Sequence, residues 1–268
     1  MIERKLHDLL RILKEMESVV VAYSGGVDST SLLSVALEAL GDRVLAVTAV
    51  SASLPERERQ DATRIAKALG ARHILLETEE LEDPGFVANA PDRCYHCKLS
   101  RFRDLRDYAR RLGYRTVVDG TNAEDAGDHR PGRWAARELG VRSPLEEVGL
   151  TKAEIRQLAR TRGLPNWDAP SDACLASRIP YGTPITAGRL SRIGRAEEVL
   201  RELGLGQLRV RDHGEIARIE LEPGDLAACL KHRHRVIQEL RSLGYAYVTL
   251  DLQGFRSGSM NEVLNDGS

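Results

Sequence analysis

Seven consecutive residues near the amino terminus combine small, polar and acidic side chains in an order that suits anion binding. They read Ser24-Gly25-Gly26-Val27-Asp28-Ser29-Thr30 and follow the apolar run 19–23. That run is typical of a buried parallel strand, and the polar segment is typical of a turn that opens into a helix. Gly25 and Gly26 allow backbone N–H groups to approach an anion closely. The positive end of the helix would face the same anion, so the sequence predicts a phosphate-binding turn.

This turn differs from the two commonest nucleotide-binding motifs, because it lacks the Lys of a Walker A loop and the G-x-G-x-x-G spacing. It resembles the PP-loop of the ATP pyrophosphatase superfamily, Ser-Gly-Gly-x-Asp-Ser-[Ser/Thr], at every position from Ser24 to Thr30. The resemblance implies that ATP is cleaved between its α- and β-phosphates and that a carbonyl or carboxylate oxygen is adenylated. An ordinary strand-to-helix turn is the alternative interpretation.

Asp28 supplies a carboxylate beside the predicted phosphates. A carboxylate in this place can hold Mg²⁺, which neutralises charge on the departing pyrophosphate. It could also cap the helix that follows, and both roles can coexist. The residues of this turn that we expect to bind ATP are Ser24, Gly25, Gly26, Asp28 and Ser29, with Asp28 also binding Mg²⁺.

A second polar segment follows another predicted strand. Residues 119–128 read Asp-Gly-Thr-Asn-Ala-Glu-Asp-Ala-Gly-Asp and contain four carboxylates. In a parallel sheet, this segment would lie at the same carboxyl edge as the Ser24 turn. We therefore expect a nucleotide or metal role for it, with Asn122 contacting ATP. A solvated acidic loop is the alternative.

Cys174 lies in a loop that is bounded by Pro and Gly residues, four positions before Arg178. A thiol in that setting can be partly exposed and biased toward the thiolate. A structural cysteine more often lies among apolar residues, as Cys229 does. A functional role and a structural role for Cys174 both stay open on the local sequence.

A C-x-x-C pair, Cys94-Tyr95-His96-Cys97, begins a predicted helix. Zinc would need a second ligand pair of similar spacing, which the sequence does not offer. A redox pair is an alternative, although the thioredoxin context is absent. Together with Cys174, the pair could supply three thiolates to an iron–sulfur cluster with one open iron.

Two arginines in the last third of the chain are candidates for phosphate binding. Arg209 and Arg211 alternate with Leu208 and Val210, so both guanidinium groups should emerge on one face of a strand. Two parallel guanidinium groups suit a phosphate. A solvated polar face is the alternative, and the basic run 231–235 is interpreted as a solvated helical face.

Strand-like and helix-like segments alternate along the chain, which indicates an α/β fold with a doubly wound parallel sheet covered by helices on both faces. The predicted strands of this sheet are 19–23, 43–49, 72–77 and 116–119, and the predicted helices are 29–40, 55–69, 95–112 and 152–162. Because ligands bind at the carboxyl ends of parallel strands, the Ser24 turn should lie in the crevice.

We expect three parts of the chain: an ATP-binding domain at 1–168, a loop or linker carrying Cys174 at 169–186, and a smaller α/β domain at 187–268. In the last part, helices are predicted at 187–203 and 225–243 and strands at 207–212, 217–221 and 245–250. A module of this size should be docked or oligomeric, since small domains bury little core. We expect it to bind substrate phosphate and to form a homo-oligomer.

Composition restricts the functional classes. A net charge of −1, with 42% hydrophobic and 29% charged residues, does not favour a nucleic-acid or membrane partner. No apolar run approaches the ~20 residues of a membrane span. Residues 1–17 predict an amphipathic helix rather than a signal peptide. Four cysteines in 268 residues do not make a disulfide scaffold, so a cytoplasmic location is expected.

Taken together, these segments resemble the LarE family, which makes the nickel-pincer nucleotide cofactor of lactate racemase. The specific matches are the segment around Cys174 and the Gly-Ser-Met-Asn-Glu tail at 258–262. All matching stretches lie between residues 24 and 262, namely 24–31, 93–98, 119–122, 173–178 with 180–182, 209–211 and 250–262. The implied activity is ATP-dependent conversion of the carboxylates of pyridinium-3,5-biscarboxylic acid mononucleotide into thiocarboxylates.

The resemblance also implies roles for individual residues. A substrate carboxylate would be adenylated by Mg²⁺-ATP, and the Cys174 thiolate would displace AMP to form a thioester. In sacrificial members the Cβ–S bond then breaks and dehydroalanine remains. Arg209 and Arg211 match the pair that holds the substrate phosphate, and Arg178 is expected to contact the same phosphate. Carboxylates linked to metal binding and desulfurisation in the family fall near Glu198 and Glu220.

One departure bears on the source of sulfur. Sacrificial family members lack the C-x-x-C pair, whereas this chain has Cys94 and Cys97. The resemblance then points to the branch in which three cysteines bind a [4Fe–4S] cluster and sulfide is passed on catalytically. The sacrificial use of Cys174 stays open when no cluster is bound. Functional partners are expected among the other proteins of pincer-cofactor biosynthesis.

Three other functions compete with this interpretation. A tRNA thiolase of the PP-loop type would share the turn and the sulfur chemistry, but it normally adds a basic RNA-binding surface. The net charge of −1 and the 4% aromatic content do not favour that surface. An amidotransferase-type synthetase subunit would need an ammonia-producing domain. A nucleotide sensor would not need a cysteine near the turn.

Overall fold

The computed structural model describes residues 2–126, 132–170, 173–256 and 259–261. The motif residues Asp128, Asp172, Gly258 and Glu262 lie outside the described residues. The chain forms two compact units, Met1–Phe86 with Asp92–Asp172 and Val87–Pro91 with Ala173–Ser268. The division after Asp172 falls inside the segment 169–186 that the sequence marks as a linker. The crossing of residues 87–91 into the second unit has no signal in the sequence.

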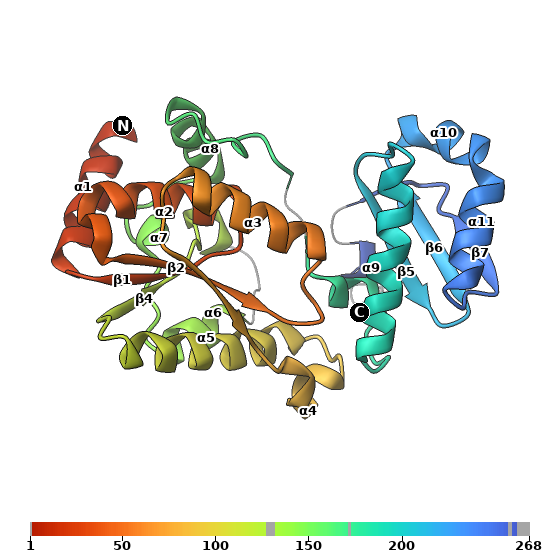
Figure 1. The fold of residues 1–268 in the computed structure, drawn as a ribbon, viewed down its shortest axis with the longest axis horizontal. Helices are drawn as coiled ribbons and strands as arrows, with labels where there is room; N and C mark the ends of the chain where they lie inside the picture. Colours follow the sequence, from red (N-terminus) through yellow and green to blue (C-terminus); the bar gives the residue numbers. More distant parts are fainter. Residues whose placement is uncertain (1, 127–131, 171–172, 257–258, 262–268) are drawn as a thin grey trace. The chain divides into compact units, whose positions relative to one another are not determined.

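The first unit contains a four-stranded parallel sheet with the strand order β3-β2-β1-β4 (Figure 1). Its strands are β1 (Val19–Ala22), β2 (Val44–Val50), β3 (His73–Glu77) and β4 (Thr116–Val118). The apolar β-branched residues of β1 and β2 are buried on both faces, as expected for a parallel sheet between two helix layers. The predicted doubly wound fold is confirmed.

Helices cover both faces of this sheet (Figure 1). One layer contains α1 (Ile2–Glu15), α2 (Val27–Leu40), α3 (Glu56–Ala68) and α8 (Lys152–Thr161), and the other contains α5 (Arg93–Arg111) and α6 (Gly132–Glu138). Alternate residues of β1 point into the two cores, Val19 and Val21 into one and Val20 into the other. Shorter helices connect the elements: α4 (Pro84–Val87), α7 (Pro144–Glu147), η1 (Gly41–Arg43), η2 (Glu80–Glu82) and η3 (Ala123–Ala126).

The second unit contains a three-stranded mixed sheet in the order β5-β6-β7. Strands β5 (Leu208–His213) and β6 (Ile216–Leu221) are antiparallel, and β7 (Tyr247–Leu250) runs parallel to β6. The other elements are α9 (Ala187–Glu202), α10 (Leu226–Lys231), α11 (Arg233–Ser242), η4 (Leu175–Arg178), η5 (Pro223–Asp225) and η6 (Ser259–Asn261).

One face of this second sheet is apolar and packs on helices, and the other face is charged. Leu208, Val210 and Ile219 join α9, α10 and α11 in a common core. The helix predicted at 225–243 is two helices, because His232 ends α10 and precedes α11. Cys229 of α10 and Val236 of α11 both lie in this core. Among the described residues of either unit, the helices are too short or too polar to cross a bilayer.

Candidate active site

The predicted phosphate-binding turn lies at the carboxyl end of β1. Gly26 is the N-cap of α2, and no side chain caps this helix start. Gly25 has a φ of +78°, and a Cβ there would lie 2.9 Å from the Ala62 Cα atom. Both features require glycine, since a side chain would be strained and would collide with α3. The backbone N–H groups at the start of α2 are therefore presented without a covering side chain.

Two serine hydroxyl groups brace this turn. The Ser24 and Ser29 Oγ atoms are 3.1 Å apart, and Ser29 Oγ donates to the Gly26 carbonyl at 3.1 Å. Ser29 Oγ also accepts from the Ser24 N–H at 3.3 Å. These bonds connect Ser24, at the start of the turn, with Ser29 and fix the shape of the turn. Such preorganisation lowers the free-energy cost of ordering the loop on binding.

The polar segment after β4 lies against the same turn, because β1 and β4 are parallel neighbours. A Cβ at Gly120 would lie 2.9 Å from the Ser29 backbone nitrogen, so the two backbones are in close contact. Asp119 is buried and accepts from the Ser143 hydroxyl at 2.7 Å and from the Thr121 hydroxyl at 2.7 Å. Asp119 thus stabilises this segment rather than facing solvent.

Asp28 and Asn122 lie together beside the turn. The Asp28 Oδ2 atom is 2.6 Å from the Lys152 Nζ atom and accepts from the Asn122 amide at 3.4 Å. The Asp28 Oδ1 atom is buried and has no hydrogen-bond partner among the described residues. A buried carboxylate oxygen without a partner is costly unless a ligand satisfies it, and carboxylate oxygens are the ligands that Mg²⁺ prefers. Asp28 therefore fits a Mg²⁺ ligand.

Sequence reasoning missed two residues of this site. Lys152 is the first residue of α8, which starts with a Thr151–Glu154 capping box, and its backbone N–H donates to the Glu124 carboxylate at 3.0 Å. Asn166 donates from its amide to the Gly25 carbonyl at 2.7 Å and to the Thr30 hydroxyl at 3.0 Å. Both lie far from the turn in sequence. The capping pattern around Lys152 was a signal for a helix start but not for contact with Asp28.

A polar chain runs behind the turn. The Thr48 hydroxyl donates to the Tyr23 carbonyl at 2.7 Å and lies 2.8 Å from the His73 Nε2 atom. Burial lowers the pKa of His73 and raises the pKa of Tyr23. Both side chains are therefore neutral near pH 7, and the start of α2 and Lys152 supply positive charge beside the turn.

In the second unit, Cys174 precedes η4 and its thiol is free and half-buried. The buried Arg178 guanidinium donates to the carbonyl oxygens of Ala173 and, at 3.1 Å, of Cys174. It also binds the fully buried Glu197 at 2.8 Å and 3.1 Å. Arg178 thus anchors the backbone around Cys174 to α9 through a buried ion pair.

The predicted phosphate-binding arginines lie on the charged face of the second sheet and are both buried. Arg211 donates to the Glu220 carboxylate at 2.7 Å, to the Ser259 hydroxyl at 2.8 Å and to the Ser177 carbonyl at 3.0 Å. The Arg209 guanidinium lies 5.1 Å from the centroid of the Phe255 ring. The segment after β7 therefore covers both arginines.

Comparison with known proteins decides the family. A pyridinium-3,5-bisthiocarboxylic acid mononucleotide synthase of Lactiplantibacillus plantarum is 42% identical over 257 residues, which cover 96% of this chain and 93% of the relative. The chain belongs to the LarE family. An uncharacterised protein of Synechocystis is 45% identical over 266 residues, covering 98% of this chain and 99% of that protein.

Other matches cover less of this LarE-family chain. A family model described as NAD synthase matches residues 2–121, which contain the Ser24 turn. A tRNA-specific 2-thiouridylase of Rickettsia typhi is 29% identical over 208 residues, covering 63% of this chain and 58% of that protein. The similarity to these two groups is thus shorter or weaker than the similarity within the LarE family.

The two predicted carboxylates of the LarE family differ in their surroundings. Glu220 is fully buried and binds Arg211 and Arg218. Glu198 is exposed, whereas its neighbour Glu197 is fully buried against Arg178 and Arg201. Side chains at adjacent positions of a helix point about 100° apart, so Glu197 faces the core while Glu198 faces solvent. The buried carboxylate in this part of α9 is therefore Glu197.

The C-x-x-C pair lies at the start of α5 in the first unit, where Cys94 is exposed, Cys97 is half-buried and neither forms a disulfide. The described residues contain no group of three or more His, Cys, Asp or Glu side chains arranged to hold a metal ion. The His96 Nδ1 atom is 3.6 Å from the Asp83 carboxylate. Cys174 belongs to the other unit, so the cluster stays a prediction.

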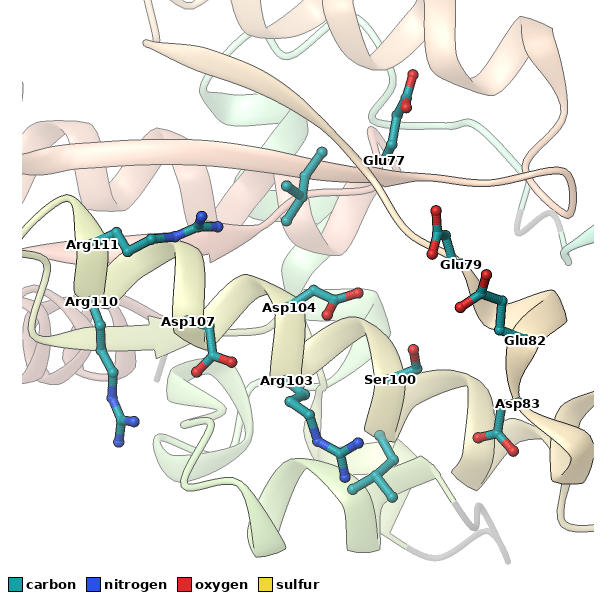
Figure 2. A pocket seen from close by; sticks show the side chains of 12 residues that line it. Glu77, Glu79, Glu82, Asp83, Ser100, Arg103, Asp104, Asp107, Arg110 and Arg111 are labelled. Carbon is teal, nitrogen blue, oxygen red and sulfur yellow. The ribbon is translucent and has the colours of Figure 1, made fainter.

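A groove of about 970 Å³ runs along the edge of the first unit between β3 and α5 (Figure 2). Figure 2 shows Glu79, Glu82 and Asp83 along one side and Arg103 on the helix. Burial and the neighbouring Asp107 and Glu80 carboxylates raise the pKa of Asp104 in this groove. None of the residues predicted from sequence to bind ATP or sulfur lines it.

Proposed function

We propose that this chain is an ATP-dependent sulfurtransferase that converts the carboxylates of pyridinium-3,5-biscarboxylic acid mononucleotide into thiocarboxylates. The named relative from Lactiplantibacillus plantarum makes the corresponding bisthiocarboxylic acid mononucleotide, according to its name. The observation that carries the proposal is the Asp28 carboxylate, which has one oxygen bound to Lys152 and one buried oxygen open beside the uncapped start of α2. This arrangement suits Mg²⁺-ATP.

The first step is the adenylation of a substrate carboxylate. The carboxylate oxygen attacks the α-phosphorus of ATP, the bond to the bridging oxygen breaks, and pyrophosphate leaves. The N–H groups at the start of α2 would bind the phosphates, and the positive charge of Lys152 would stabilise the negative charge on the departing pyrophosphate. Mg²⁺ on Asp28 would supply further charge neutralisation when bound. Asn122 orients Asp28, and Asn166 orients the Gly25 carbonyl and the Thr30 hydroxyl.

Two routes for sulfur are compatible with the cysteines. In the sacrificial route, the Cys174 thiolate attacks the acyl carbon, AMP leaves, and a thioester forms. A base then removes the Cys174 Cα proton, the Cβ–S bond breaks, the thiocarboxylate leaves and dehydroalanine remains. In both routes Arg178 is a positioning residue, because its guanidinium holds the backbone on either side of the thiol.

The second route uses a [4Fe–4S] cluster, and the presence of Cys94 and Cys97, neither of which forms a disulfide, supports it. Cys94, Cys97 and Cys174 would be its ligands, since three thiolates leave one iron open. The group would supply sulfide for transfer to the acyl adenylate. This route leaves the Cys174 side chain intact after turnover.

The test of the function is product analysis of the anaerobically purified chain with ATP and the dicarboxylate mononucleotide. We expect AMP, pyrophosphate and thiocarboxylate. Asp28→Asn should abolish AMP formation, whereas Asp42→Asn, which changes an exposed aspartate of the same unit, should not. Formation of ADP and phosphate as the main products would contradict the proposal.

A second experiment separates the two sulfur routes. In the cluster route, Cys94→Ala or Cys97→Ala should remove iron and the brown chromophore and stop turnover with added sulfide. Cys229→Ala is the matched control, because this cysteine lies in the core of the second unit. In the sacrificial route, these changes should have little effect, and the intact mass should fall by one H₂S after the single turnover that each chain can perform.

Assembly and location complete the proposal. We propose a homo-oligomer in the cytoplasm that acts with the other proteins of pincer-cofactor biosynthesis. None of the four cysteines forms a disulfide, which suits a reducing compartment. Light scattering of the purified chain would test the oligomeric state, and a monomer at micromolar concentration would contradict it.

A further inference from the structure

A short segment between two helices of the first unit belongs to the second unit and carries a buried asparagine. It comprises residues 87–91, from the end of α4 to just before α5, and Asn89 at its centre is fully buried. Two backbone hydrogen bonds attach it to the loop that follows η4. The Gly182 N–H donates to the Asn89 carbonyl at 3.0 Å, and the Ile185 N–H donates to the Val87 carbonyl at 3.0 Å. The segment and this loop are therefore backbone neighbours.

The Asn89 side chain donates to carbonyl oxygens of the same loop. Its Nδ2 atom lies 2.8 Å from the Pro180 oxygen, 2.9 Å from the Thr183 oxygen and 3.4 Å from the Ile179 oxygen. Carbonyl oxygens that converge repel one another, and a buried carbonyl without a donor is costly. A carboxamide supplies two N–H donors from one nitrogen, whereas an ionised carboxylate of the same shape has none. The Asn89 amide therefore holds the loop in its turned conformation.

The backbone of Asn89 has a conformation that few residues adopt. Its φ is +54°, which lies in the left-handed region. In the part of the chain that the structure describes, the other non-glycine residue with a positive φ is Glu17, which is exposed. Asparagine tolerates this region better than most residues that carry a Cβ atom. A buried residue keeps such a conformation where its surroundings require it, so Asn89 fits a specific role rather than an ordinary surface turn.

Arg178 holds the other end of the same loop. Its guanidinium donates to the carbonyl oxygens of Ala173 and Cys174. It also binds the buried Glu197 of α9 at 2.8 Å. These contacts fix the backbone at and before the thiol, whereas Asn89 fixes the backbone several residues after it. A side chain on a loop that is anchored on both sides has few positions available, as a reacting group requires.

We propose that Asn89 is a positioning residue for the sulfur step, because its amide holds the loop that carries Cys174. This assignment rests on the proposed function, in which Cys174 donates sulfur or binds the cluster. Asn89 acts through the carbonyl oxygens of the loop. Without its amide the loop opens more often, and the thiol spends less time in the position that sulfur transfer needs. Adenylation does not depend on Asn89, since Asp28 and Lys152 lie in the first unit.

Alkylation of the full, iron-free chain by iodoacetamide tests the loop without any substrate. Peptide mass spectrometry gives the rate at Cys174 and, in the same sample, at Cys229 in the core of the second unit. Asn89→Gly removes the amide but permits the left-handed backbone. It should raise the rate at Cys174 by about 10- to 100-fold and leave Cys229 unchanged. Glu17→Gly, at the exposed left-handed position, is the matched control and should change neither rate.

Two further measurements separate the amide from the backbone and the sulfur step from adenylation. Asn89→Asp replaces the donors by a charged acceptor, so it should raise the alkylation rate at Cys174 above that of Asn89→Gly. At saturating ATP and mononucleotide, Asn89→Gly should lower the rate of thiocarboxylate formation by about 10-fold or more and keep pyrophosphate–ATP exchange within about twofold of the wild type.

The outcomes distinguish positioning from general stability. A wild-type alkylation rate at Cys174 in Asn89→Gly would overturn the assignment. Equal increases at Cys174 and Cys229, or equal losses of exchange and thiocarboxylate formation, would also overturn it, because the second unit as a whole would then be affected. If the wild-type chain forms no thiocarboxylate while Asn89→Gly exposes Cys174 alone, the proposed function fails and Asn89 still holds the loop. If thiocarboxylate forms at the same rate in both chains, the proposed function stands and the role of Asn89 is refuted.

Discussion

Replacement of Lys152 by Met tests whether its contact with Asp28 serves catalysis. The Nζ and Oδ2 atoms are 2.6 Å apart, and the two side chains are 26% and 22% exposed. At an effective dielectric constant of ~20, the gross attraction over this distance is about 6 kcal/mol. Desolvation and lost side-chain entropy offset most of it. We expect a loss of about 1–2 kcal/mol in the free energy of unfolding, between the values for exposed and buried pairs.

Lys5 provides a control of matched geometry. Its ammonium group is 2.6 Å from the Glu154 carboxylate, and these side chains are 22% and 21% exposed. Lys5→Met should therefore cost a similar free energy of unfolding. Lys5 does not contact the turn, whereas Lys152 is expected to face the charge that develops on pyrophosphate. Lys152→Met should also lower kcat for AMP formation by about 10²- to 10³-fold, as for the loss of one preorganised charge contact.

The assay combines urea unfolding with AMP release and pyrophosphate–ATP exchange at saturating ATP. Lys152→Arg should recover part of the rate, because the charge is retained. The reasoning would be refuted if Lys152→Met kept kcat within about threefold of Lys5→Met at equal stability. Lys152 would then support the fold around Asp28 without stabilising the transition state.

The remaining predictions concern pH, packing and sulfur. Burial lowers the pKa of His73. The neutral ring therefore contributes its full stability above the unfolded pKa of about 6.5, and this contribution is lost as the pH falls through the lower folded value. Because His73→Gln removes the titrating ring, this variant should lose less stability in urea unfolding than the wild type between about pH 7.5 and about pH 5.5. Gly120→Ala should lower the free energy of unfolding by about 1–3 kcal/mol and weaken ATP binding, because its Cβ would lie 2.9 Å from the Ser29 nitrogen. Gly188→Ala should do neither, since the space around Gly188 is open. Equal melting temperatures for the two variants would contradict this prediction. Cys174→Ser should stop thiocarboxylate formation while the pyrophosphate–ATP exchange of the adenylation step continues, and thiocarboxylate detected by mass spectrometry would exclude Cys174 as a sulfur ligand or donor.

Local sequence patterns determined most of the architecture. The apolar β-branched run before Ser24 is typical of a strand buried on both faces, and the two glycines after it permit the turn into α2. The same reasoning predicted that the segments after β1 and β4 meet at one sheet edge, because parallel neighbours end on the same side. Arg209 and Arg211 were placed on one strand face by the two-residue period alone.

Tertiary structure decided which polar groups meet. Lys152 and Asp28 are 124 positions apart in the chain, and only the packing of α8 beside α2 brings their charges together. Arg218 faces Arg211 because of the register of a hairpin, and a register depends on pairing across strands rather than on either strand. A shift of one position on α9 exchanges the exposed Glu198 for the buried Glu197. Sequence periodicity therefore determined the faces of the elements, whereas the partners of each charge depended on how those faces pack against residues distant in the chain.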